Sequence, residues 1–131
     1  MQFKRLETGD VLALPDDLLW VDEHAWTSAV ASVSYLLTGA LLVESATRLS
    51  GRPITLVGPP DMGWVTRAVV KQLHGWAAAI GARFELTLAD GRLFTVTFRV
   101  HETAIEAEPV KGFAARSDND PYRLTLRLME V

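Results

Sequence analysis

Apolar and polar residues alternate strictly in three segments of the C-terminal half, and this pattern constrains the fold more than any other feature. The alternation covers residues 84–88, 94–98 and 122–128. Successive side chains of a strand point to opposite faces of a sheet. Each segment is therefore expected to form a β-strand with one buried face, and the last strand would carry Arg123 and Arg127 on its outer face.

The loop between the first two strands follows from the side chains that must share a face. A two-residue Asp90-Gly91 loop would put the two apolar sets on opposite sides of the hairpin. A three-residue loop that begins at Ala89 pairs Leu86 with Phe94, so both apolar sets lie on one face. We therefore predict the three-residue loop, with Gly91 in the left-handed conformation beside a bulge.

One segment, about residues 62–80, has a clear helical period. It follows a Gly-Pro-Pro break, Asp61 is in position to cap it, and Gly81 is a natural stop. Gly75 is expected to weaken its middle by roughly 1 kcal/mol relative to alanine. We expect one apolar stripe of this helix to pack against the sheet: Val65, Val69, Leu73, Trp76 and Ile80.

The apolar run at residues 28–49 has two interpretations. As a helix it would be long, with Gly39 in its middle. As two strands it would place Val33 and Tyr35 on one face and turn at Thr38-Gly39. Its enrichment in β-branched and aromatic residues favours strands. Its most apolar part, residues 29–43, is 15 residues long and contains two serines and a threonine, whereas a membrane-spanning helix needs roughly 20 apolar residues.

Composition narrows the class of protein. The chain has 131 residues, 13 Lys+Arg, 16 Asp+Glu and no cysteine. It can therefore form no disulfide, no thiolate metal site and no cysteine nucleophile. The net charge is −3, whereas a general nucleic-acid binder carries an excess of basic residues. Since no apolar block follows the basic pair near the N-terminus, no secretory signal is expected, and the default location is the cytoplasm or an assembly built there.

The expected fold is a β-rich α+β domain with a single flanking helix. Residues 1–131 read as one domain, because no linker or repeat interrupts them. Within it, residues 1–27 form an acidic N-terminal segment. Residues 28–131 form a sheet, either a β-sandwich or a small barrel, with the helix laid across it or over its mouth.

No convergent set of catalytic or metal-binding residues appears, so catalytic, cofactor and metal sites are all predicted to be absent. The histidines lack a partner at a metal-binding spacing, and no nucleophile elbow is present. Glu106 and Glu108 share one strand face and would be the acid–base pair of an enzyme. The favoured explanation is a solvent-exposed face of an edge strand.

Two polar segments that contain aromatic residues, residues 16–26 and 111–121, are the natural contact elements. Tryptophan is enriched at interface hot spots, although at least one tryptophan of the first segment is expected in the core. The candidate protein-contact residues are Asp16, Asp17, Trp20, Trp26, Lys111, Phe113, Arg116, Arg123 and Arg127.

Four stretches resemble the small tail proteins of bacteriophages and phage-derived contractile particles. They are GRPITL (51–56), LTLADGRLFTVTFR (86–99), EAEPV (106–110) and YRLTLRL (122–128). The resemblance implies a tail-tube-like β-sandwich or barrel with one flanking helix. That fold serves in tube rings, tube initiators and baseplate pieces, among them the small baseplate component called the ripcord.

The resemblance implies a structural role without an active site or cofactor. The chain would be one of several symmetric copies that link tube, hub and wedge proteins. It would bind no specific nucleic acid and insert into no membrane. It would reside in a virion or phage-tail-like particle assembled in the bacterial host cytoplasm. The alternative is a soluble ligand-binding β-barrel with tryptophans in its mouth, and an enzyme that uses Glu106 and Glu108 is a third interpretation.

Overall fold

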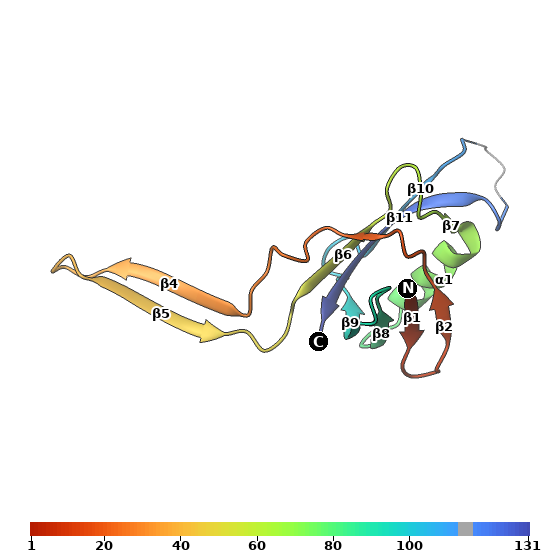
Figure 1. Ribbon diagram of the computed structural model, residues 1–131. Coiled ribbons are helices and arrows are strands. Elements are labelled where there is room, and N and C mark those ends of the chain that lie inside the picture. The colour runs from red at the N-terminus through yellow and green to blue at the C-terminus, as the bar shows by residue number, and fades with distance from the viewer. Residues whose placement is uncertain (113–116) are drawn as a thin grey trace.

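The computed structural model describes residues 1–112 and 117–131 and shows a curled sheet, one helix and a projecting hairpin (Figure 1). In chain order the elements are β1 (Gln2–Arg5), β2 (Val11–Ala13), β3 (Leu19–Trp20), β4 (Ala29–Tyr35), β5 (Leu41–Thr47), β6 (Pro53–Val57), β7 (Val65–Thr66), α1 (Arg67–Ala77), β8 (Phe84–Thr87), β9 (Leu93–Phe98), β10 (Ile105–Pro109) and β11 (Pro121–Glu130).

The main sheet is antiparallel and is organised around β11. Its strands follow the order β2-β1-β8-β9-β11-β6-β3, and β7 and β10 pair with the N-terminal part of β11. β11 is ten residues long, so its two edges accommodate four partners. The expected β-rich α+β fold with one helix and antiparallel strands is confirmed for the described residues.

The sheet must curl, because a short connection joins its two outermost strands. The chain from Ala13 to Leu19 spans at most about 22 Å when fully extended. A flat sheet in this strand order would separate β2 from β3 by roughly 29 Å. In agreement, the rings of Trp20 on β3 and Phe94 on β9 are 5.4 Å apart. β2 and β3 are not paired in the described residues, so the small closed barrel, one of the two expected forms, is not formed.

The inner face of the curled sheet packs against the helix, and the two together form the core. Phe3 stacks on Phe84 at 5.0 Å and lies 5.8 Å from Trp76 of α1. Alternate residues of β6, β8 and β11 and of the second half of β9 point inward, as the period of two predicted. The largest fully buried side chains are Phe3, Phe84, Ile54, Leu56, Leu73, Leu86, Leu124, Leu126, Leu128 and Val96.

The helix is shorter than its sequence pattern predicted. It begins at Arg67, and Thr66, not Asp61, accepts the capping hydrogen bond from the Val69 N–H at 3.5 Å. The preceding Val65–Thr66 pair is β7, which extends the sheet beside β11. Because the helix ends at Ala77, the expectation that Ile80 is buried is wrong.

The buried helical stripe is otherwise close to the predicted one. Val65, Leu73 and Trp76 are buried, and Val69 is half-buried against the core. Val70, which the stripe did not include, is also buried.

The predicted register of the β8–β9 hairpin is confirmed. Leu86 lies opposite Phe94. The Leu88 N–H donates to the Arg92 carbonyl at 2.9 Å, which closes a three-residue loop. Gly91 has a φ of 92°, the left-handed conformation that the loop requires.

The acidic N-terminal segment is an integral part of the sheet. β1 lies between β2 and β8, and Phe3 of β1 is fully buried. The segment therefore contributes outer strands and core to the same unit as the C-terminal strands.

Residues 29–47 form a separate hairpin outside the body. β3 and β6 are antiparallel neighbours, so the chain between them is an insertion between two paired strands. β4 and β5 lie within this insertion and pair with each other over seven residues each. The preference for strands over a helix in the 28–49 run is thus confirmed, although these strands do not join the main sheet.

Leu73→Ala should destabilise the protein by about 2 to 5 kcal/mol, because it removes a fully buried side chain between helix and sheet. Ile80→Ala is the matched control. Its fully exposed side chain should contribute within about 0.5 kcal/mol. Urea unfolding of both variants measures the difference, and equal effects would contradict this position of the helix end.

Gly91→Val should destabilise the protein by on the order of 1 kcal/mol or more, because a β-branched residue resists positive φ. Gly75→Ala is the opposite control. The added Cβ would have no atom within 4 Å, so this helical substitution should stabilise by about 1 kcal/mol. The two melting temperatures should therefore move in opposite directions.

Candidate functional site

The projecting hairpin, residues 29–47, is the candidate functional site and is called the arm. Its register pairs Ala29 with Thr47 at the base and Tyr35 with Leu41 near the tip. Among the described residues, β4 and β5 form hydrogen-bonded ladders only with each other. Figure 1 shows the arm extending from the body on the side opposite α1 and β10. Both outer edges of the arm are consequently open to pairing.

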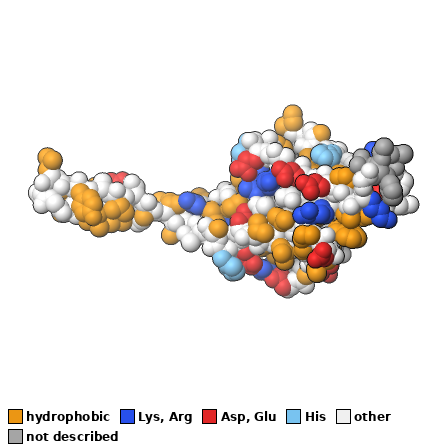
Figure 2. Space-filling view, turned by 90° about the horizontal axis from the view of Figure 1, so that it is seen from above, with side chains coloured by type: hydrophobic (Ala, Val, Ile, Leu, Met, Phe, Trp, Pro, Cys, Tyr) orange, Lys and Arg blue, Asp and Glu red, His pale blue; other side chains and the backbone are white. Residues whose placement is uncertain are grey.

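The arm surface is apolar despite its exposure. Val30 is the only arm residue that is even half-buried, and Glu44 is the only charged residue between positions 29 and 47. Figure 2 shows apolar side chains along the arm, whereas the body carries many charged ones. The exposed large apolar residues of the arm are Val33, Tyr35, Leu36, Leu37, Leu41, Leu42 and Val43. A contiguous set of this kind marks an interaction surface.

One face of the arm carries an apolar stripe. On one face Val33 lies opposite Val43 and Tyr35 opposite Leu41, and the exposed fraction of Tyr35 is 77%. This makes the outer half of that face an apolar stripe, because directly opposed residues share a face.

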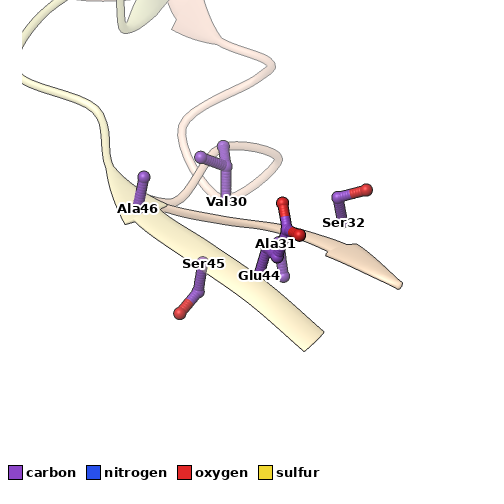
Figure 3. A pocket seen from close by; sticks show the side chains of 6 residues that line it. All are labelled: Val30, Ala31, Ser32, Glu44, Ser45 and Ala46. Carbon is purple, nitrogen blue, oxygen red and sulfur yellow. The ribbon is translucent and has the colours of Figure 1, made fainter. Parts of the chain in front are cut away.

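Smaller residues towards the base of the arm leave a hollow. In Figure 3, Val30 and Ala46 point to one side of the ribbon and Ser45 to the other. The lining residues are Val30, Ala31, Ser32, Glu44, Ser45 and Ala46. The hollow allows close approach of a partner backbone, whereas the apolar stripe offers side chains to a partner.

The tip repeats the turn geometry of the β8–β9 hairpin. The Leu36 N–H donates to the Ala40 carbonyl at 2.8 Å, and the Gly39 N–H donates to the Leu36 carbonyl at 2.9 Å. Gly39 has a φ of 85°. The fully exposed side chain of Leu37 therefore sits in a defined three-residue loop at the far end of the arm.

Polar contacts attach the neck of the arm, residues 20–28 and 48–55, to the body. The backbone N–H and the hydroxyl of Thr55 donate to the Asp22 carboxylate at 2.9 and 2.7 Å. Arg99 in turn donates to the Thr55 hydroxyl. Where the arm itself starts, the Arg48 N–H donates to the Ser28 carbonyl at 2.6 Å. The arm thus projects from an anchored base.

A charged cluster lies beside the neck. Arg92 of the β8–β9 hairpin contacts Glu23 at 2.7 Å and Asp90 at 2.7 Å. The hydrogen bond from the Arg92 backbone N–H holds the pKa of Asp90 below its ordinary value, and the hydrogen bond with Glu23 raises the pKa of Arg92. Because both groups are solvent-exposed, screening limits what these pairs contribute to stability.

Both candidate tryptophans lie at the neck. The guanidinium of Arg52 stacks 4.7 Å from the Trp20 ring, and that of Arg48 lies 5.7 Å from the Trp26 ring. Trp20 also contacts Phe94 and packs against the core. These are cation–π distances, so both rings support the arm base from within the chain.

The other predicted contact residues are scattered over the body. Asp16 pairs with the amino group of Met1, while Asp17 and Lys111 are exposed. Arg123 and Arg127 face Glu108 and Glu106 of β10 at 3.6 and 3.1 Å. Phe113 and Arg116 lie outside the described residues.

The structure therefore does not bring the predicted contact set together on one surface. The arm itself was absent from that set. The sequence did contain a signal for the arm, because the run consists of strand-forming residues with almost no charge.

Catalytic and metal-binding geometry was sought in the same residues. Residues 1–112 and 117–131 contain no group of three or more His, Asp or Glu side chains placed to hold a metal ion. Glu106 and Glu108, the acid–base pair of the enzyme interpretation, each form an ion pair with an arginine of β11. Within this described part, no helix is long and apolar enough to cross a membrane.

No protein-family model, curated protein or solved structure matches this chain.

Asp22→Ala should loosen the neck, because it leaves two donors of half-buried Thr55 without their acceptor. Loss of a partner of this kind costs about 1 to 3 kcal/mol. Amide hydrogen exchange at Thr55 should quicken in Asp22→Ala and less so in Asp22→Asn, which keeps one acceptor oxygen. Unchanged protection of the Thr55 amide would contradict the anchoring role.

Proposed function

We propose that this chain is a non-catalytic assembly subunit that contacts a neighbouring protein through its arm. The observation that carries the proposal is the exposure of the arm. Two seven-residue strands with one charge between them lie outside the only sheet that has a core in the described residues.

The energetics of such an arm favour a bound state. An isolated two-stranded hairpin is at best marginally stable in water. Apolar surface that leaves water contributes roughly 25 cal/mol per Å². A partner that covers the apolar stripe therefore stabilises both the contact and the hairpin. A strand edge of the partner can also pair with β4 or β5, since main-chain hydrogen bonds supply affinity in β-strand addition.

The proposed setting is a bacteriophage-type tail or baseplate. It is supported by the short motifs at residues 51–56, 86–99, 106–110 and 122–128, which resemble small tail proteins in the same order along the chain. In that setting the chain is a ripcord-like or tube-fold component that links tube, hub and wedge proteins in several symmetric copies. The particle assembles in the bacterial host cytoplasm.

The ligand-binding alternative receives less support. It requires tryptophans around the mouth of a closed barrel, whereas this sheet is open. The hollow that Trp20 lines is also lined by Asp16, Glu23 and Arg92, and arginine side chains lie against the Trp20 ring. These charges leave little apolar surface for a small ligand.

The experiment is excision of the arm. Because the Arg48 N–H already donates to the Ser28 carbonyl, residues 29–47 can be replaced by Asn-Gly to form a four-residue turn. The excised chain should keep its melting temperature, since no arm residue belongs to the core. The tail particles that it enters should be absent or lack their baseplate by electron microscopy.

A subtler variant separates the arm surface from the presence of the arm. Val33→Ser combined with Val43→Ser keeps the hairpin but removes an apolar pair of the stripe, so it should also impair assembly. Leu93→Ser, an exposed residue of the body, is the matched control and should assemble normally. Intact, infectious or contractile particles from the arm-excised chain would overturn the proposal.

A further inference from the structure

A groove lined by basic side chains lies at the end of the body opposite the arm. It lies between α1 and β10, and Arg67, Lys71 and His74 line it on one face of the helix. Its apolar part is formed by Val70, Ile105 and Tyr122. Residues three and four apart are neighbours on a helix surface, so the three basic side chains form one rim. We call this the α1–β10 groove.

The rim already holds one carboxylate. Lys71 contacts Asp118 at 2.6 Å, and this hydrogen bond lowers the pKa of Asp118 from its ordinary value. The pair is exposed, so water and a second carboxylate can compete for the lysine. A basic rim beside an apolar floor fits an apolar segment that carries an acidic side chain.

The strand next to the groove is also open on one side. In the described part of the chain, β10 pairs only with β11. Its acidic residues Glu106 and Glu108 are paired across the ladder to arginines of β11. They belong to the strand face opposite Ile105 and Ala107, which line the groove.

We propose that the α1–β10 groove receives the arm of a second copy of this chain, with Glu44 of the arm facing the basic rim. The inference rests on the proposed function, because it names a partner for one face of the arm, the face of Leu42 and Glu44 that lies opposite the apolar stripe. Glu44 is the single charge of the arm, and it faces a rim of three basic residues. Both elements have an unpaired strand edge, so β-strand addition is available to them.

The contact has to be between copies. The arm and the groove lie at opposite ends of the molecule, and the arm points away from the body (Figure 1). Each copy therefore offers an arm to one neighbour and a groove to another. Such a head-to-tail contact builds a closed ring or an open stack of copies. Individually small contacts become durable when several close together.

Disulfide trapping tests the contact directly, because the chain has no cysteine of its own. A chain with Ser32→Cys and His74→Cys keeps Glu44, which lies directly opposite Ser32, and should form a ladder of linked oligomers on oxidation that reduction collapses. His74 is an exposed rim residue. The control is Glu7→Cys with His74→Cys, which places the first cysteine in the exposed β1–β2 turn and should remain mostly monomeric.

Charge reversal tests the pairing of Glu44 with the rim. The unmodified chain should form concentration-dependent oligomers in sedimentation. Glu44→Lys should abolish them, and adding Lys71→Glu in the same chain should restore them. Glu7→Lys, an equal change of charge on the body, should leave them unchanged.

The outcomes separate the two proposals. No ladder above the control, or a ladder without rescue by the charge swap, overturns the self-contact. If arm excision still abolishes particle assembly in that case, the arm binds a different protein and the proposed function stands. If arm excision has no effect on particles while the ladder forms, the self-contact stands and the assembly role falls.

Discussion

Pairing along β11 is the interaction on which the rest of the body depends. Four strands take their register from it, β6 and β7 along one edge and β9 and β10 along the other. Its alternate residues Leu124, Leu126 and Leu128 are fully buried, so a slip of one residue would expose them all. The short connection from β2 to β3 then forces the sheet to curl around these side chains, and α1 covers them.

The arm follows from the same arrangement. The inner face of the curled sheet is filled by its own strands and by the helix, so the apolar chain inserted between β3 and β6 finds no core to join. It pairs with itself and projects. The polar neck around Asp22 and Thr55, with Arg52 over Trp20, holds its base in place. The apolar residues of the arm are therefore exposed on a hairpin whose base is held in place.

The two ends of the molecule therefore differ in chemistry. The arm carries apolar side chains and one carboxylate, and the far end carries a groove with a basic rim. Neither feature requires a catalytic group. Under the proposed function, both are surfaces that are exposed in one copy and would be covered on assembly.

Much of the body could be predicted from local patterns. The hairpin at Gly91, the alternation in β11 and the single helix all rest on residues within a few positions of one another, where backbone geometry restricts the choices. The helix ends were harder to predict. Thr66 caps the helix because Val65 and Thr66 pair with β11, a contact with a strand more than fifty positions away in the chain.

Local sequence patterns were also insufficient to locate the candidate contact site. Trp20 and Trp26 were predicted as contact residues because tryptophan is enriched at interface hot spots, and Arg123 because it lies on the outer face of its strand. In the structure each also contacts a side chain of the same chain. By itself, the sequence determined that β8, β9 and β11 are strands and which of their faces are apolar, because side-chain period and turn chemistry are local. Only the tertiary structure decided which apolar faces are buried. That outcome depends on how many strands the curled sheet accommodates, and the 29–47 hairpin is left outside it.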